Sequence, residues 1–203
     1  MKSLILFKPL ITKDLQTYLD ELNEVLDISR VPEWNANCTE ADTFVNFINL
    51  TVKRLKSEGS QPIDLVFTHG DFCPANILST KDGIRIVDWE NAGYRSLLFD
   101  FFSYFFYRPV NIKNISSEKM SSELHQSLSV FISGLDLKVM STFNVYRRLY
   151  YLEYLCKLAE RLCTDKRLNI MDYIMRYIDA FNLFDQNCND ETMGCQVKSM
   201  IYT

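Results

Sequence analysis

The segment THGDFCPAN, residues 68–76, runs directly into ILSTKDGIRIVDWE, residues 77–90, and this stretch decides the fold. It carries three polar residues, Asp71, Asn76 and Asp88, in an otherwise apolar, strand-rich neighbourhood. Pro74 stands between the first two, and a proline inside a helix removes a backbone donor and clashes with the preceding turn. A loop is therefore predicted, which leaves the Asp71 and Asn76 side chains free to point at one spot.

A β-hairpin is predicted to follow this loop. Lys81-Asp82-Gly83 is a good turn between Ile77-Leu78 and residues 84–87. The two strands of a hairpin are antiparallel, so the end of the second strand lies beside the start of the first. Asp88 is therefore expected to lie near Asn76. A carboxylate and an amide oxygen are suitable ligands for a hard cation such as Mg²⁺. A base beside a metal clamp is the arrangement needed around a transferring phosphoryl group.

The composition is that of an ordinary globular protein. The chain has 203 residues, 47% apolar and 24% charged, with a net charge of −4, so neither nucleic acid nor an anionic membrane is expected as a partner. Its longest apolar run, residues 97–107, is too short and too interrupted to span a membrane. The first eight residues lack a signal peptide's apolar region, so a cytoplasmic location is predicted. The six cysteines show no CxxC spacing and are interpreted as core thiols.

The rest of the chain predicts a single α+β domain that is mostly helical. Thr12 is expected to cap a helix reaching about residue 28, and Thr39 one reaching about residue 57. Further helices are expected from near residue 96, over 117–132, over 137–163 and over 168–184. The predicted divisions are a hinge-like strand (1–10), two helices (12–58), a catalytic loop with hairpin (64–90), a helical subdomain (96–184) and a loosely held tail (185–203).

Taken in order, the motifs resemble a known enzyme family. His69-Gly70-Asp71 with Asn76, then a hairpin, then Ile86-Val87-Asp88-Trp89-Glu90 and a downstream Asp100 resemble the catalytic core of the aminoglycoside phosphotransferase and choline kinase superfamily. These are small-molecule relatives of protein kinases. The helical remainder is similar to their C-terminal lobe in architecture only. Choline kinases usually carry Asn where this chain has Gly70, so the aminoglycoside-like branch fits better.

The resemblance implies roles for six residues. Asp71 would be the catalytic base that takes the proton of the acceptor hydroxyl, and His69 would brace its loop. Asn76 and Asp88 would hold Mg²⁺ and through it ATP, while Glu90 would join the metal shell or the acceptor site. Asp100, in the apolar run Leu97–Phe102, would accept the loop amides, which would offset the cost of burying a carboxylate. The alternative is that Asp100 lies on the solvent-exposed face of an amphipathic helix.

The acceptor is predicted only by class, as a small molecule with a hydroxyl group such as a sugar or an amino alcohol. The last two helices mix acidic and basic residues, which favours a neutral or anionic saccharide over a cationic aminoglycoside, although many of these charges could form solvated faces. The tyrosines at 146, 150, 151 and 154 are interpreted as core packing, with an acceptor cleft as the alternative.

The nucleotide-binding N-lobe of such kinases is not recognisable. The first glycine is Gly59, so no Gly-rich loop precedes the motif. Lys8 with Glu21 or Glu24 resembles the Lys–Glu pair of that lobe, but the short spacing to the next helix leaves no room for its strands. The chain is therefore interpreted as a C-lobe alone. Three functions stay open: an ATP-dependent phosphotransferase, a truncated or non-catalytic binding module, and half of a split enzyme whose N-lobe is another protein.

Overall fold

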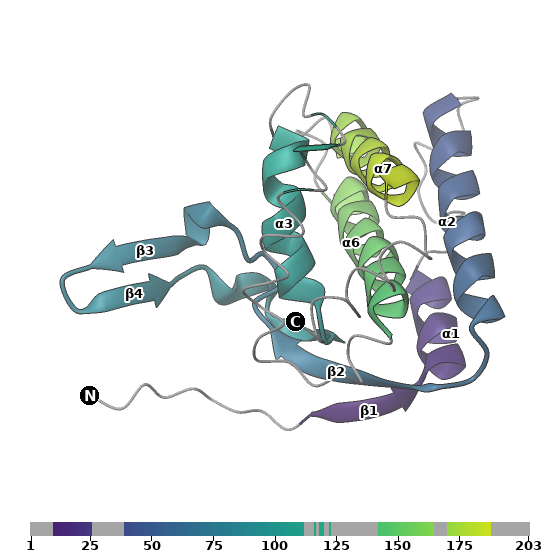
Figure 1. Cartoon of the computed structure of the whole chain (residues 1–203), viewed down its shortest axis with the longest axis horizontal. Coiled ribbons are helices and arrows are strands. Elements are labelled where there is room, and N and C mark those ends of the chain that lie inside the picture. The colour runs from purple at the N-terminus through teal and green to yellow at the C-terminus, as the bar shows by residue number, and fades with distance from the viewer. Residues whose placement is uncertain are drawn as a thin grey trace.

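The computed structural model describes residues 10–25, 39–111, 116, 118–119, 122, 142–164 and 170–187. Over these residues the fold is α+β and mostly helical, with two small antiparallel sheets. Figure 1 shows the helices gathered above the larger sheet, while β3 and β4 extend away from the body as a separate hairpin. Residues 1–9 of the predicted hinge-like strand, most of the predicted helix at 117–132 and the tail beyond 187 lie outside the described residues.

The larger sheet has three strands in the order β1-β2-β5, formed by β1 (Ile11–Asp14), β2 (Pro62–Thr68) and β5 (Gly93–Ser96). Leu65 in the central strand pairs with Ile11 on one side and Ser96 on the other. The short apolar run at residues 65–67 predicts the central strand, but no sequence pattern predicts either neighbour. Both neighbours are four residues long and pair with chain far away in sequence, so no local turn signal marks them.

The first helix, α1 (Leu15–Val25), begins later than predicted. Thr12 is not its cap; it lies in β1, and its hydroxyl donates to Asp64 Oδ1 at 2.9 Å. Instead, Asp14 Oδ1 accepts the amides of Gln16 (2.9 Å) and Thr17 (3.3 Å). The Asp14 carboxylate stands directly before the helix, where it satisfies amides that have no partner within the helix.

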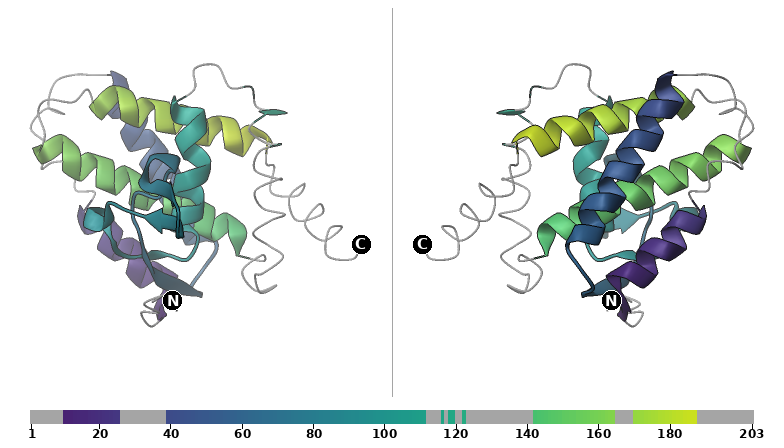
Figure 2. Two further views of the ribbon diagram at one scale, coloured as in Figure 1. Left: turned by 90° about the vertical axis from the view of Figure 1, so that its left-hand side faces the viewer. Right: turned by 90° about the vertical axis from the view of Figure 1, so that its right-hand side faces the viewer.

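The remaining described helices pack around one central helix, α6 (Phe143–Thr164). It contacts α1, α2 (Thr39–Ser57), α3 (Phe99–Asn111), α7 (Ile170–Asn187) and β5. Figure 2 shows α2 crossing both α6 and α7, which it contacts. Residues 145–159 of α6 are all buried, which is typical of a helix at the centre of a core.

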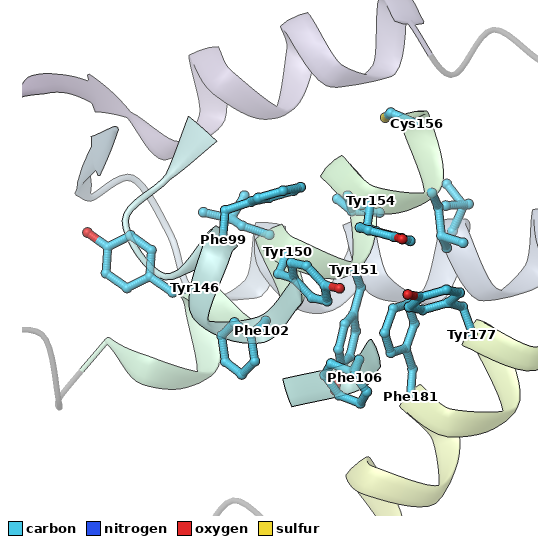
Figure 3. Packing of buried hydrophobic residues seen from close by; sticks show 14 of the residues in the cluster. Phe99, Phe102, Phe106, Tyr146, Tyr150, Tyr151, Tyr154, Cys156, Tyr177 and Phe181 are labelled. Atoms are coloured by element: carbon cyan, nitrogen blue, oxygen red, sulfur yellow. The ribbon is translucent and has the colours of Figure 1, made fainter. Parts of the chain in front are cut away.

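Aromatic side chains fill the space between α3, α6 and α7. Tyr151 stacks on Phe181 with ring centroids 4.0 Å apart, and Phe106 meets Phe181 edge-on at 4.9 Å. Figure 3 shows these rings together with Tyr150 and its neighbours. The prediction that the tyrosine cluster of α6 packs in the core is confirmed, since all four members are buried. Cys73 and Cys156 are buried free thiols, as predicted.

The charged residues of α6 and α7 divide between surface and interior: Glu160 and Asp172 are exposed, whereas Glu153 and several other charged residues of α6 are buried. Glu153 accepts hydrogen bonds from the Ser96 amide (2.7 Å), the Ser96 hydroxyl (2.5 Å) and the Tyr18 hydroxyl (2.5 Å). It thereby joins α6 to β5 and α1. Burial raises the pKa of Glu153, although these hydrogen bonds oppose the rise.

Helix α7 also extends past its predicted end. Asp185, expected in the loose tail, lies in α7 and accepts from Tyr151 Oη at 3.0 Å and from Arg54 Nη1 at 3.1 Å. These contacts tie the last described turns to α2 and α6, so the helix continues to Asn187.

Candidate functional site

The predicted loop and hairpin lie where the sequence places them. After β2 the chain turns through His69–Cys73 into the 3₁₀ helix η3 (Pro74–Asn76), and then forms β3 (Ile77–Thr80) and β4 (Gly83–Ile86). Ile77 pairs with Ile86, and the amide of Val87 donates to the carbonyl of Asn76 at 3.0 Å. Asp88 therefore follows directly after the residue that is bonded to Asn76. The predicted return of the chain is confirmed for the backbone.

Asp100 fastens the first part of the loop to α3. Its Oδ2 accepts the amide of His69 at 2.6 Å, and its Oδ1 accepts the amide of Gly70 at 3.0 Å. Burial raises the pKa of Asp100, while the two amide hydrogen bonds and the nearby side chains of His69 and Arg95 oppose the rise. The sequence left two positions open for Asp100, an acceptor of the loop amides or the exposed face of an amphipathic helix. The structure shows the first.

His69 links the loop to the end of the hairpin. The side chain is 2% exposed, its Nε2 lies 2.7 Å from the carbonyl of Val87, and its Nδ1 lies 3.2 Å from the amide of Asp71. A proton on Nε2 makes both contacts hydrogen bonds, because Nε2 then donates and Nδ1 accepts. The ring also meets Trp89 edge-on at 4.7 Å. This geometry fits the bracing role that the resemblance implies.

Gly70 is required by both conformation and space. Its φ is +80°, and a Cβ at this position would lie 2.1 Å from the carbonyl oxygen of Asn91 and 2.6 Å from Arg95 Nη1. Any other residue here would clash with the Asn91 backbone. It would also have to adopt the left-handed conformation, which is unfavourable for residues other than glycine. The asparagine usual in choline kinases cannot be placed here without moving the Asn91 backbone.

Asp71 is paired with a lysine that sequence reasoning missed. Lys157 Nζ on α6 donates to Asp71 Oδ1 at 3.1 Å and to the Gly70 carbonyl at 2.7 Å. The Lys157 side chain is 8% exposed and that of Asp71 is 34% exposed. Burial lowers the pKa of Lys157, and the Asp71 carboxylate opposes this. The spacing shows only that Lys157, three residues after Tyr154 and seven after Tyr150, shares a face of α6 with these two tyrosines.

Asn76 and Asp88 offer ligands of the right chemistry for Mg²⁺. Asn76 Nδ2 donates to the carbonyl of Asp71 at 2.9 Å, which leaves Oδ1 as the free end of the amide. Asp88 is exposed, has φ 66° and ψ 59°, and makes no capping hydrogen bond to η4 (Trp89–Asn91). A non-glycine residue in this conformation is uncommon, and such strain concentrates at functional sites.

Glu90 lies in η4 and is exposed. Within the described part of the chain, no group of three or more His, Cys, Asp or Glu residues could hold a metal ion. A carboxylate and an amide oxygen remain sufficient for Mg²⁺, which usually takes one or two carboxylates and completes its shell with water and substrate phosphates. The donor set of Asn76 and Asp88 therefore fits the ion.

A cavity of about 350 Å³ opens beside Asp71. Its walls come from the loop and from α3, α6 and α7, and five of the eleven lining residues are aromatic. The lining residues are Asp71, Phe72, Cys73, Ser103, Tyr107, Tyr154, Leu158, Arg161, Ile170, Tyr173 and Tyr177. Tyr154 thus belongs both to the core cluster and to this wall, and Arg161 Nη2 also lies 3.4 Å from Asn91 Oδ1. Asp71 is the one carboxylate among these described lining residues.

Residues 18–113 match the model of the phosphotransferase enzyme family, APH. Over this segment, just under half of the chain, the protein is similar to that family. No curated protein matches the chain. In the part of the chain that the structure describes, no helix is both long enough and apolar enough to cross a membrane.

The phosphotransferase match divides the site into two parts. All six residues singled out from the sequence lie inside the matched segment, from His69 to Asp100. Lys157 and most of the aromatic cavity wall lie beyond it, on α6 and α7. The family motif could therefore not indicate them, and only the packing of α6 against the loop brings them to the site.

Proposed function

We propose that this protein transfers the γ-phosphate of ATP to a hydroxyl group of a small molecule. The observation that carries the proposal is the position of Asp71, whose carboxylate lines a cavity while its loop also carries Asn76 and adjoins Asp88. A base next to an acceptor space and a pair of metal ligands are the recurring parts of a phosphoryl-transfer site.

Asp71 is the proposed catalytic base. Lys157 engages its Oδ1, and within the described residues no hydrogen bond engages its Oδ2. An acceptor hydroxyl in the cavity would donate to Oδ2, which orients the hydroxyl oxygen for attack on the γ-phosphorus. The proton passes to Asp71 as the new oxygen–phosphorus bond forms, and ADP leaves with the electron pair of the broken bond.

Asn76 Oδ1 and Asp88 are the proposed ligands of Mg²⁺, with Glu90 as a further candidate. When bound, the ion would neutralise charge on the β- and γ-phosphate oxygens of ATP. The protein's own part is to hold the two ligands close together, through the hydrogen bond between the Val87 amide and the Asn76 carbonyl.

The cavity supports a neutral or anionic acceptor built on a single ring. Its volume of about 350 Å³ is at the small end of the range for ligand pockets, roughly 300–1,000 Å³. Tyrosine rings offer apolar faces and hydroxyl groups together, which suits the two sides of a sugar ring. A polycation would need several carboxylates, whereas the described walls contribute Asp71 and the cationic Arg161.

A second candidate function is supported by the hairpin surface. Leu78, Ile84, Ile86 and Trp89 are exposed there, and Ile84 reaches 76% exposure. By the register of the hairpin, Ile84 and Ile86 lie on one face and Leu78 on the other, and exposed apolar side chains gathered in this way mark interaction sites. The chain would then act as a binding module, or as the half of a split enzyme whose nucleotide-binding half covers this hairpin.

Turnover assays separate the two candidates. The wild-type chain and Asp71→Asn are incubated with Mg²⁺, ATP and panels of neutral, anionic and cationic hydroxyl compounds, and ADP release is followed. The phosphotransferase proposal expects release that needs both acceptor and Asp71. Absence of release, together with no thermal shift at millimolar Mg·ATP, would reject it for this chain alone and favour the binding module.

A further inference from the structure

We propose that Lys157 is the positioning residue of this site, holding the Asp71 carboxylate and the Gly70 carbonyl so that the second Asp71 oxygen faces the cavity. The inference rests on the proposed function for its meaning in catalysis. The contact itself does not depend on that function.

The position of Lys157 in the fold is unusual for a lysine. It lies in the fully buried stretch 145–159 of α6, where an apolar side chain of similar length would pack without the cost of burying a charge. Its ammonium reaches out of the core to two oxygens of the loop, at 2.7 Å and 3.1 Å. Both partners belong to the segment that presents the proposed base.

Lys157 and Asp100 hold the same loop from two helices. Asp100 on α3 accepts the amides of His69 and Gly70, while Lys157 on α6 donates to the Gly70 carbonyl and to the Asp71 side chain. Gly70 is thus fixed through both its amide and its carbonyl. Only the Lys157 contact acts on a side chain that would touch the acceptor, so it restricts the rotation of the Asp71 carboxylate directly.

The charged groups around Lys157 act in opposite directions on its ammonium form. Asp71 favours the ammonium form, whereas Arg161 and Arg95 disfavour it, and the Tyr154 ring lies 5.4 Å from Nζ. Burial is the largest influence and lowers the pKa of Lys157. The Asp71 carboxylate is therefore the main group that keeps this buried ammonium charged.

The first experiment compares turnover in Lys157→Met, Lys157→Arg and Lys53→Met, the last being an exposed lysine of α2. We expect kcat to fall about 100-fold in Lys157→Met, with the KM for ATP unchanged, because misplacing a catalytic group by about 1 Å has an effect of that size. Lys157→Arg should recover part of the loss, and Lys53→Met should match the wild type. Unchanged kcat in folded Lys157→Met would overturn the proposal.

The second experiment needs no turnover. The side-chain nitrogen of Lys157 is titrated by NMR in the wild type and in Asp71→Asn. The wild-type midpoint should lie below that of the exposed lysines, and removal of the Asp71 charge should lower it further, by at least about one pH unit. An unchanged midpoint would refute the pairing of Lys157 with Asp71. If the wild type phosphorylates no acceptor, the proposed function fails, and this titration alone decides whether Lys157 holds Asp71.

Discussion

Asp100 accepts the backbone amide of His69 at 2.6 Å, although the two residues are separated by two hairpin strands, two 3₁₀ turns and β5. A second bond from the Gly70 amide makes the carboxylate a two-point anchor. Because Asp71 follows immediately, the orientation of the proposed base depends on a residue of α3 that lies in the most apolar run of the sequence.

Substitution Asp100→Asn should therefore destabilise the protein. The new side chain offers one oxygen acceptor and one NH₂ donor, so one of the two loop amides meets a donor. A buried amide left unsatisfied costs about 1–3 kcal/mol, and the free energy of unfolding should fall by that amount. Urea denaturation measures it, with Asp179→Asn on the exposed face of α7 as the control. Equal stability of the two variants would mean that the anchor contributes nothing.

Two glycines with similar backbone angles allow strain and steric clash to be separated. Gly59 has φ +75° with no atom within 4 Å of an added Cβ, whereas Gly70 has φ +80° with the Asn91 carbonyl oxygen 2.1 Å from it. Gly59→Ala should lose about 1–2 kcal/mol of unfolding free energy, which is the cost of the left-handed conformation. Gly70→Ala should lose clearly more, because the loop or η4 must move. Similar losses in the two variants would show that the site has room for a side chain.

The catalytic loop was predictable because its signals are local. Pro74 excludes an α-helix through the loop, Lys81-Asp82 supplies the turn, and the hairpin register then brings Asp88 back to Asn76. None of these steps requires knowledge of a distant segment. The family resemblance adds roles to these residues, but their proximity already follows from turn chemistry and the pairing of adjacent strands.

The missed features all depend on distant contacts. β1 and β5 become strands only because β2 lies between them, and Thr12 lies in β1 for the same reason. Glu153 and Lys157 read as ordinary helix charges in sequence, since periodicity alone cannot show that α6 is surrounded on every side. Their polar partners, Ser96 and Asp71, come from segments that α6 meets only in the folded protein.

The buried Glu153 should give the stability a specific pH dependence. Burial raises its pKa in the folded state above the ordinary 4.5, so the folded protein binds a proton at pH values where the unfolded chain has lost it. Its contribution to the free energy of unfolding is therefore full at low pH and is lost as pH rises from about 4.5 through the folded pKa. The Glu153→Gln variant should lack this decrease of the free energy of unfolding with rising pH. The Glu24→Gln variant, changed at an exposed residue, should retain it.

Denaturation of Glu153→Gln, Glu24→Gln and the wild type at a series of pH values makes this measurement. The slope difference cannot exceed about 1.4 kcal/mol per pH unit for one proton. Gln also places an NH₂ group against the three donors from Ser96 and Tyr18, so Glu153→Gln should be less stable at every pH. Parallel pH curves for the Glu153→Gln variant and the wild type would contradict the titration of Glu153.

Asp88 provides the most direct test of the proposed metal site. Its side chain is exposed, and among the residues that the structure describes no hydrogen bond or ion pair uses its carboxylate, so Asp88→Asn should leave the free energy of unfolding nearly unchanged. Loss of a charged ligand should nevertheless raise the Mg²⁺ concentration needed for half-maximal turnover by at least about tenfold, which corresponds to about 1.4 kcal/mol. Asp82→Asn, in the exposed turn of the same hairpin, is the matched control and should leave the Mg²⁺ requirement unchanged. If both variants respond to Mg²⁺ like the wild type, the ion does not bind at Asp88.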